Sequence, residues 1–194
     1  STAVAIGGGN ATQNFSVAIG NNSEAMALRT MAIGTDVRTT GNEALSIGRG
    51  TVARSFASTA IGVYNDSIIA SNKTTFVATD PLFILGNGTD DDNRSNALVV
   101  LKNGKTGIGV NNPTEKLEVE GSFRLGTNGT AINSIIYQIV QWVGINLPAN
   151  KTITKTFTVT GVNGALNGSV IVSPRDPLPD GIVIAYARVS ANNT

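Results

Sequence analysis

Residues 4–7 read Val-Ala-Ile-Gly, and the phrase returns at 17–20 (Val-Ala-Ile-Gly), 31–34 (Met-Ala-Ile-Gly), 45–48 (Leu-Ser-Ile-Gly) and 59–62 (Thr-Ala-Ile-Gly). The closing glycines lie at 7, 20, 34, 48 and 62, so successive copies are 13, 14, 14 and 14 residues apart. A period this regular implies that each copy forms one structural turn of a repeat protein.

Each copy is too short for a helical hairpin, and the phrase ends in a glycine suited to a tight turn. The repeat therefore predicts a β-solenoid built from short parallel strands. Neighbouring side chains on a strand point to opposite faces. The alanines consequently share one face and the isoleucines the other: Ile6, Ile19, Ile33, Ile47 and Ile61.

A turn of about 14 residues encloses a thin lumen that suits alanine-sized side chains, which leaves the isoleucine row without cover in a single chain. We expect the five isoleucines to form the core between the chains of a homotrimer. The repeat alone does not decide whether alanine or isoleucine lines the lumen. The alternative is a monomeric β-solenoid with a wider core.

The phrase Ser16-Val17-Ala18-Ile19-Gly20 and its 14-residue echo resemble the head repeats of YadA-like trimeric autotransporter adhesins. The resemblance covers about the first third of the chain. It implies three chains, each a left-handed parallel β-roll, around a common axis. The coiled-coil stalk and membrane barrel of that family are not readable in this sequence.

The phrase does not return on schedule after Gly62, so we expect the solenoid to end there, with Phe76 and Phe83 covering its last turn. Two Asn-Gly pairs, at 87–88 and 103–104, lie between apolar runs and predict tight hairpins joining four short strands. Residues 101–121 also resemble a shaft segment of bacteriophage tail fibres and bacterial surface fibres.

From residue 127 the apolar runs become longer, and residues 170–194 resemble a small β-sandwich at the C-terminus of such fibres. The spacing of Ile132, Ile136, Ile139 and Val143 also fits a trimeric coiled-coil seam. The relatives continue with further strands, so we expect the domain to be cut at Thr194. The full prediction is an all-β homotrimeric fibre, its chains intertwined or side by side: a parallel β-roll shaft with a cap (1–79), a β-hairpin connector (80–126) and a jelly-roll-like β-sandwich tip (127–194).

Composition narrows the functional classes. The chain has 14 Lys plus Arg against 13 Asp plus Glu, which gives no electrostatic argument for nucleic acid as a partner. It contains no His and no Cys, which removes the usual nucleophile–base pairs and thiolate metal sites. No apolar run reaches the roughly 20 residues of a membrane span. We expect no enzymatic activity, no cofactor and no metal.

Two groups of acidic residues have simpler interpretations than catalysis or metal binding. Asp176 and Asp180 are the pair that a polysaccharide depolymerase would need, but they lie in a proline-rich loop and fit a structural turn better. Asp90, Asp91 and Asp92 offer oxygen ligands for Ca²⁺ without the spaced ligand loop of an EF-hand, so a solvated turn is expected.

The remaining candidates for recognition are aromatic and polar residues of the tip, since aromatic and arginine side chains dominate binding hot spots. We expect the fibre to be extracellular, on a bacterial surface or alternatively a virion tail, and to bind a cell-surface carbohydrate or protein without catalysis. A purely structural shaft and a depolymerase remain lower alternatives. The candidate receptor-binding residues are Tyr137, Trp142, Arg175, Asp176, Asp180 and Tyr186.

Overall fold

The computed structural model describes residues 2–68, 72–129 and 131–132, and over these residues it contains strands and turns but no helix. No helix in the described ranges is therefore long and apolar enough to cross a membrane. The chain divides into two units, Ser1–Ala131 and Ile132–Thr194, of which the second lies outside the described residues apart from Ile132.

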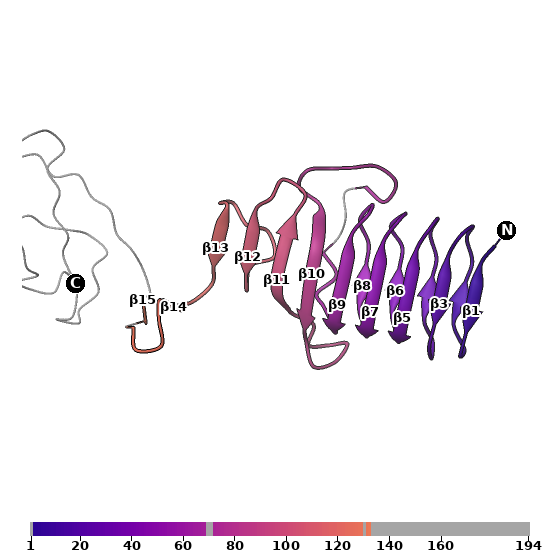
Figure 1. Ribbon diagram of the computed structural model, residues 1–194, viewed down its shortest axis with the longest axis horizontal. Helices are drawn as coiled ribbons and strands as arrows, with labels where there is room; N and C mark the ends of the chain where they lie inside the picture. The colour runs from indigo at the N-terminus through magenta and orange to yellow at the C-terminus, as the bar shows by residue number, and fades with distance from the viewer. Residues whose placement is uncertain (1, 69–71, 130, 133–194) are drawn as a thin grey trace, which may run out of the picture. The chain divides into compact units, whose positions relative to one another are not determined.

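The first unit is dominated by a nine-stranded sheet whose strands stack in chain order, from β1 in indigo to β13 in orange-pink (Figure 1). A four-stranded parallel sheet accompanies its first turns. The nine strands are β1 (Val4–Ile6), β3 (Val17–Ile19), β5 (Met31–Thr35), β7 (Leu45–Arg49), β9 (Thr59–Val63), β10 (Pro81–Asn87), β11 (Asn96–Leu101), β12 (Thr106–Ile108) and β13 (Leu117–Val119). The four are β2 (Asn10–Ala11), β4 (Glu24–Ala25), β6 (Arg38–Thr39) and β8 (Val52–Ala53).

The chain passes alternately through the two sheets from β1 to β9, and it coils as a β-solenoid of about eight turns over residues 4–119. Every strand from β1 to β9 in the large sheet pairs in parallel with the equivalent strand of the next turn. The two sheets share one narrow core, in which Ala18 and Ala32 of the large sheet pack with Ala25 and Val37. The β-solenoid predicted from the 14-residue period is confirmed. A separate two-stranded sheet joins β14 (Phe123–Arg124) to β15 (Ala131–Ile132).

Alanine lines the lumen, which settles the choice that the repeat left open. Ala18, Ala32 and Ala60 are fully buried and lie in register along the sheet with the buried Ser46. The isoleucine of each phrase points to the other face, where Ile47 remains 38% exposed. The lumen is thin because a turn of this length brings the two sheets close together.

The glycine that closes each phrase is required by the next turn of the coil. Gly34 has φ of +135°, and a Cβ atom built on it would lie 1.9 Å from the carbonyl oxygen of Gly48. The same approach recurs from Gly20 to Gly34 and from Gly48 to Gly62. A side chain at any of these positions would collide with backbone, so the stacking distance itself selects glycine.

The corners of the coil also take left-handed backbone, at residues that are all non-glycine except Gly50. Positive φ angles occur at one corner in Phe15, Arg29, Glu43 and Ala57, and at the other in Asn22, Asp36, Gly50 and Tyr64. Side chains at these corners connect consecutive turns: Arg29 pairs with Glu43 at 3.1 Å, and the Asn22 amide donates to Asp36 at 2.8 Å. Such exposed contacts align the turns more than they stabilise them.

The solenoid does not end after Gly62, contrary to the expectation from the sequence. Strand β10 continues the sheet in parallel register with β9, placing Ile84 beside Ala60 and Gly86 beside Gly62. Gly86 lies 86 − 62 = 24 residues after Gly62, so this turn is a regular 14-residue turn enlarged by 10 residues. The predicted boundary between shaft and connector, at residues 79–80, therefore does not divide the sheet, which continues to β13.

The residues expected to cover the last turn are also different. Ile84 closes the alanine lumen, in one cluster with Ala44, Ala53 and Ala60. Phe83, its neighbour on the strand, therefore points to the outer face, and Phe76 is 62% exposed. The prediction that Phe76 and Phe83 cap the coil is wrong, because strand alternation turns the smaller residue inward.

The two predicted hairpins have different outcomes. Asn103-Gly104 joins the antiparallel strands β11 and β12, with Gly104 at φ +79° and Leu101 donating to the Lys105 carbonyl at 2.9 Å. That tight turn is confirmed. Strands β10 and β11 are antiparallel as expected, but they are joined by residues 88–95 and not by a two-residue Asn-Gly turn.

The four-stranded sheet ends at β8, where a side chain takes the place of a fifth strand. Asn65 is fully buried, and its Oδ1 accepts from the Val52 backbone N–H at 2.7 Å. Its Nδ2 donates to the Val52 carbonyl at 3.1 Å. One amide thus satisfies both backbone groups of Val52 at the end of the sheet. The chain after Asn65 is free to leave the coil and form the enlarged turn.

Candidate interaction surface

The outer face of the nine-stranded sheet carries two continuous columns of side chains, both mainly apolar. We call them the isoleucine column and the flanking column, and together the outer face. In pairing register, the isoleucine column is Ile6, Ile19, Ile33, Ile47, Ile61, Leu85, Leu98, Ile108 and Val119. The flanking column is Val4, Val17, Met31, Leu45, Thr59, Phe83, Val100, Thr106 and Leu117.

Aliphatic residues occupy every position of the isoleucine column, across both the repeat and the later strands. Many of its members shield one another and are half-buried, but Ile6 is 54% and Ile108 44% exposed. Met31 and Leu117 of the flanking column are exposed as well. With strands about 4.8 Å apart, eight steps give the columns a length of about 38 Å. This is a long apolar stripe for a protein surface, where isolated apolar residues are the norm.

The opposite side of the coil has a different character. On the four-stranded sheet the outward positions of β2, β4 and β6 are Asn10, Glu24 and Arg38, and Glu24 pairs with Arg38 at 3.0 Å. Because both sheets pack against the same core, their outer surfaces face away from each other. The coil is thus apolar on one side and polar on the other.

The predicted site residues fall into two groups. The isoleucines expected at the centre of a trimer all lie on the outer face in one register, and whether other chains cover them remains a prediction. The candidate receptor-binding residues lie outside the described residues: Tyr137, Trp142, Arg175, Asp176, Asp180 and Tyr186. Sequence reasoning missed the four later members of the isoleucine column, although Gly86 and the apolar runs around it carried the signal.

Lys102 is held beside the enlarged turn by aromatic rings. Its Nζ lies 5.8 Å from the centre of the Phe56 ring and 5.7 Å from that of Phe76. Burial lowers the pKa of Lys102, while the charge of Asp80 acts in the opposite direction. The contact suits a cation held against aromatic faces, and it gives the exposed Phe76 a structural role.

Two carboxylates have lowered pKa values for local reasons. The largest cause of the lowered pKa of Asp90 is the hydrogen bond from the Asn93 side chain. The Asp90 Oδ1 also accepts from the Asn93 backbone N–H at 2.9 Å. Hydrogen bonds from the backbone and hydroxyl of Thr114 lower the pKa of Glu118. Asp90 is exposed and closes the loop between β10 and β11, as the solvated turn predicted there requires. In the described ranges no group of three acidic side chains is placed to hold a metal ion.

The fold and its outer face define the class of this protein: it is an all-β solenoid with a continuous apolar stripe on one side. Comparison with family models, with curated proteins and with solved structures finds no match for the chain. The protein is therefore identified by its fold class alone. The resemblance to adhesin heads and tail-fibre shafts remains an expectation.

Proposed function

We propose that this solenoid is the shaft of a homotrimeric extracellular fibre, in which the outer faces of three chains pack around a common axis. The observation that carries the proposal is the unbroken isoleucine column across nine strands. An apolar stripe about 38 Å long is unfavourable in water, and burying it against a partner stabilises the assembly at about 25 cal/mol per Å².

The periodicity of the stripe favours another copy of the same chain as its partner. Side chains of one kind recur at every strand spacing along the column, so a complementary surface must have the same spacing over the same length. A second copy meets this condition along the whole stripe. The number three is what the resemblance to trimeric head repeats implies, and closed symmetry of this kind is usual for homo-oligomers.

The role of such a fibre is attachment. Three copies of one binding site on a common shaft raise the avidity for a surface without any new contact. The ligand proposed for the fibre is a cell-surface carbohydrate or protein. The fibre itself is proposed to be attached to a bacterial surface or to a virion tail. A fibre of this kind needs no catalytic group, in keeping with a chain that lacks His and Cys.

The test is the mass of the chain in solution, measured by light scattering for the wild type and two variants. Ile47→Glu places a charge in the isoleucine column at a side chain that is already 38% exposed in one chain, so the coil itself is expected to fold. Asn10→Glu places the same charge on the exposed polar side and is the matched control. We expect three chains for the wild type and for Asn10→Glu, and dissociation for Ile47→Glu. A wild type of one chain would refute the proposal.

A further inference from the structure

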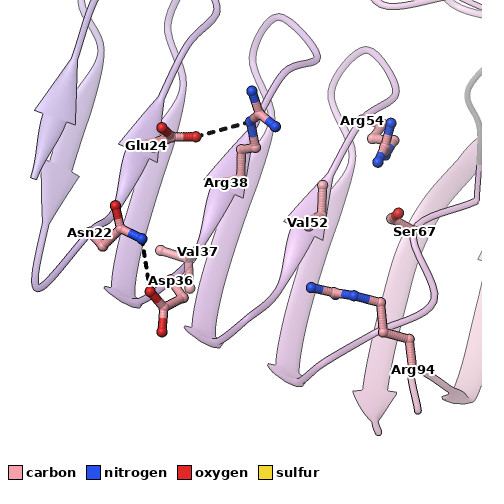
Figure 2. Close-up of a pocket in the computed structure, with 9 residues that line it drawn as sticks. All are labelled: Asn22, Glu24, Asp36, Val37, Arg38, Val52, Arg54, Ser67 and Arg94. Carbon is pink, nitrogen blue, oxygen red and sulfur yellow. Dashed lines mark hydrogen bonds and ion pairs between the residues drawn. The ribbon is translucent and has the colours of Figure 1, made fainter. Parts of the chain in front are cut away.

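A hollow lies on the polar side of the coil, at the point where the four-stranded sheet ends. Its volume is about 280 Å³, and Figure 2 shows side chains from several turns projecting around it. A second hollow of about 600 Å³ shares Arg54 and Ser67 with the first. The first is lined by Asn22, Glu24, Asp36, Val37, Arg38, Val52, Arg54, Ser67 and Arg94; the second adds Asp66, Ile68, Asn111 and Asn112.

The hollow follows from the way the sheet is closed. Because the Asn65 amide pairs with Val52, no fifth strand covers the side of β8. The chain around Ser67 does not continue this sheet. Arg54, two residues beyond Val52, therefore lies at the junction of the two hollows and lines both of them.

Two of the three arginines around the first hollow are already engaged. Arg38 Nε lies 3.0 Å from a Glu24 oxygen, the contact dashed in Figure 2. Arg94 Nη1 donates to the Gly50 carbonyl at 2.7 Å and to the Asn65 carbonyl at 3.1 Å, and its Nη2 pairs with Asp91. These two guanidinium groups hold neighbouring elements in place.

Arg54 is different. Among the described residues it has no hydrogen-bond or ion-pair partner, although its Nε is buried. The Arg54 side chain is half-buried and lines both hollows, and a guanidinium group presents its N–H donors in a fork that matches a carboxylate. The acidic residues of the hollows have other contacts, because Asp36 accepts from Asn22 and Asp66 accepts from Asn111.

We propose that Arg54 binds the carboxylate of an acidic polysaccharide, with uronic acid units lying in the two hollows. Ser67 and Asn112 have no hydrogen-bond partner among the described residues and supply neutral groups for sugar hydroxyls. Ile68, which is half-buried, supplies apolar surface for the face of a sugar ring. Asp36 and Asp66 in the same hollows disfavour an acidic peptide, whose charges are closely spaced, whereas a single carboxylate on each sugar ring can pair with Arg54 alone.

This inference deepens the proposed attachment role by naming a ligand class, and in that sense it rests on the proposed function. The site itself belongs to one chain and lies on the side away from the outer face, so it stays open when the outer faces are packed together. Binding is therefore measurable whether the chain has the mass of one copy or three, and failure of one proposal is distinguishable from failure of the other.

The experiment is calorimetric titration of the full chain with oligogalacturonate, using its methyl ester as the neutral probe. We expect the acid to bind and the ester to bind about 10-fold more weakly or worse, because the ester removes the charge that pairs with the guanidinium. Arg54→Met should weaken binding of the acid about 10- to 100-fold. Arg29→Met removes an equal charge at an exposed corner outside both hollows and should leave binding unchanged.

Arg54→Lys retains the charge but lacks the forked guanidinium, so its affinity for the acid should fall toward that of Arg54→Met. If Arg54→Met does not fold, Arg54→Lys replaces it as the test variant. The proposal is overturned if the wild type does not bind oligogalacturonate, if the acid and the ester bind equally, or if Arg54→Met and Arg29→Met behave alike. Equal binding of an oligo-aspartate peptide would overturn the assignment to a sugar acid.

Discussion

Replacing Gly34 by alanine tests the explanation of why each phrase ends in glycine. The added Cβ would lie 1.9 Å from the carbonyl oxygen of Gly48, and the φ of +135° is one that side chains rarely adopt. The backbone strain costs about 1–3 kcal/mol. Relief of the collision requires adjacent turns to separate by more than about 1 Å, which weakens backbone hydrogen bonds worth about 1 kcal/mol each. We expect a total loss of about 3–5 kcal/mol.

Gly121→Ala is the matched control. Gly121 has φ of +109°, but a Cβ built there meets no atom within 4 Å. It carries the backbone strain without the collision, so its loss of stability should be about 1–3 kcal/mol.

The assay is urea unfolding followed by circular dichroism, which gives the free energy of unfolding of each variant. If Gly34→Ala is too unstable to fold, its failure beside a folded Gly121→Ala supports the same conclusion. Equal stability of the two variants would refute the argument that contact between turns, and not φ alone, selects glycine in the phrase.

Three further predictions concern single side chains. Asn65→Ala leaves the N–H and C=O of Val52 without their partners and should cost about 2–4 kcal/mol in urea unfolding, whereas Asn22→Ala, which loses one exposed contact, should cost less than about 0.5 kcal/mol. The pKa of Lys102 is lowered, so the unfolded chain binds its proton more tightly; the free energy of unfolding should rise as pH increases toward 10.5, and Lys102→Met should remove that rise. The pKa of Asp90, followed by NMR titration, should lie below 3.8 and increase in Asn93→Ala, and no change on substitution would contradict the assigned cause.

The 14-residue period was sufficient to predict the coil because it reflects one repeated geometric condition. A thin lumen accepts alanine at positions such as Ala18 and Ala32, and close stacking accepts only glycine at positions such as Gly34. Both conditions restrict the residue type at each turn and are therefore visible in a single sequence.

The later turns were missed because they meet the same conditions with other residues. Ile84 takes the position of the alanine in the core, beside Ala60, and the enlarged turn delays Gly86 by 10 residues relative to the period (24 − 14). An aliphatic residue followed by glycine at 85–86 was the available signal. Its significance depends on pairing with β9, which the sequence alone does not supply.

The hollow at Arg54 was beyond sequence reasoning for a different reason. It depends on Asn65 replacing a strand and on residues from three separate segments, represented by Arg54, Ser67 and Asn111, meeting at one point. Positive φ angles at corners such as Phe15 and Arg29 were equally unreadable, since these residue types do not favour that conformation.

The most direct test of the account is chemical cross-linking of single cysteines, which is clean because the chain has no native cysteine. Ile47→Cys places a thiol in the isoleucine column, and Asn10→Cys places one on the polar side. With a short thiol-reactive cross-linker at low protein concentration, we predict that Ile47→Cys is linked between chains and Asn10→Cys is not. Equal linkage of the two variants, or none at Ile47→Cys, would contradict the claim that the outer face is buried between copies of this chain.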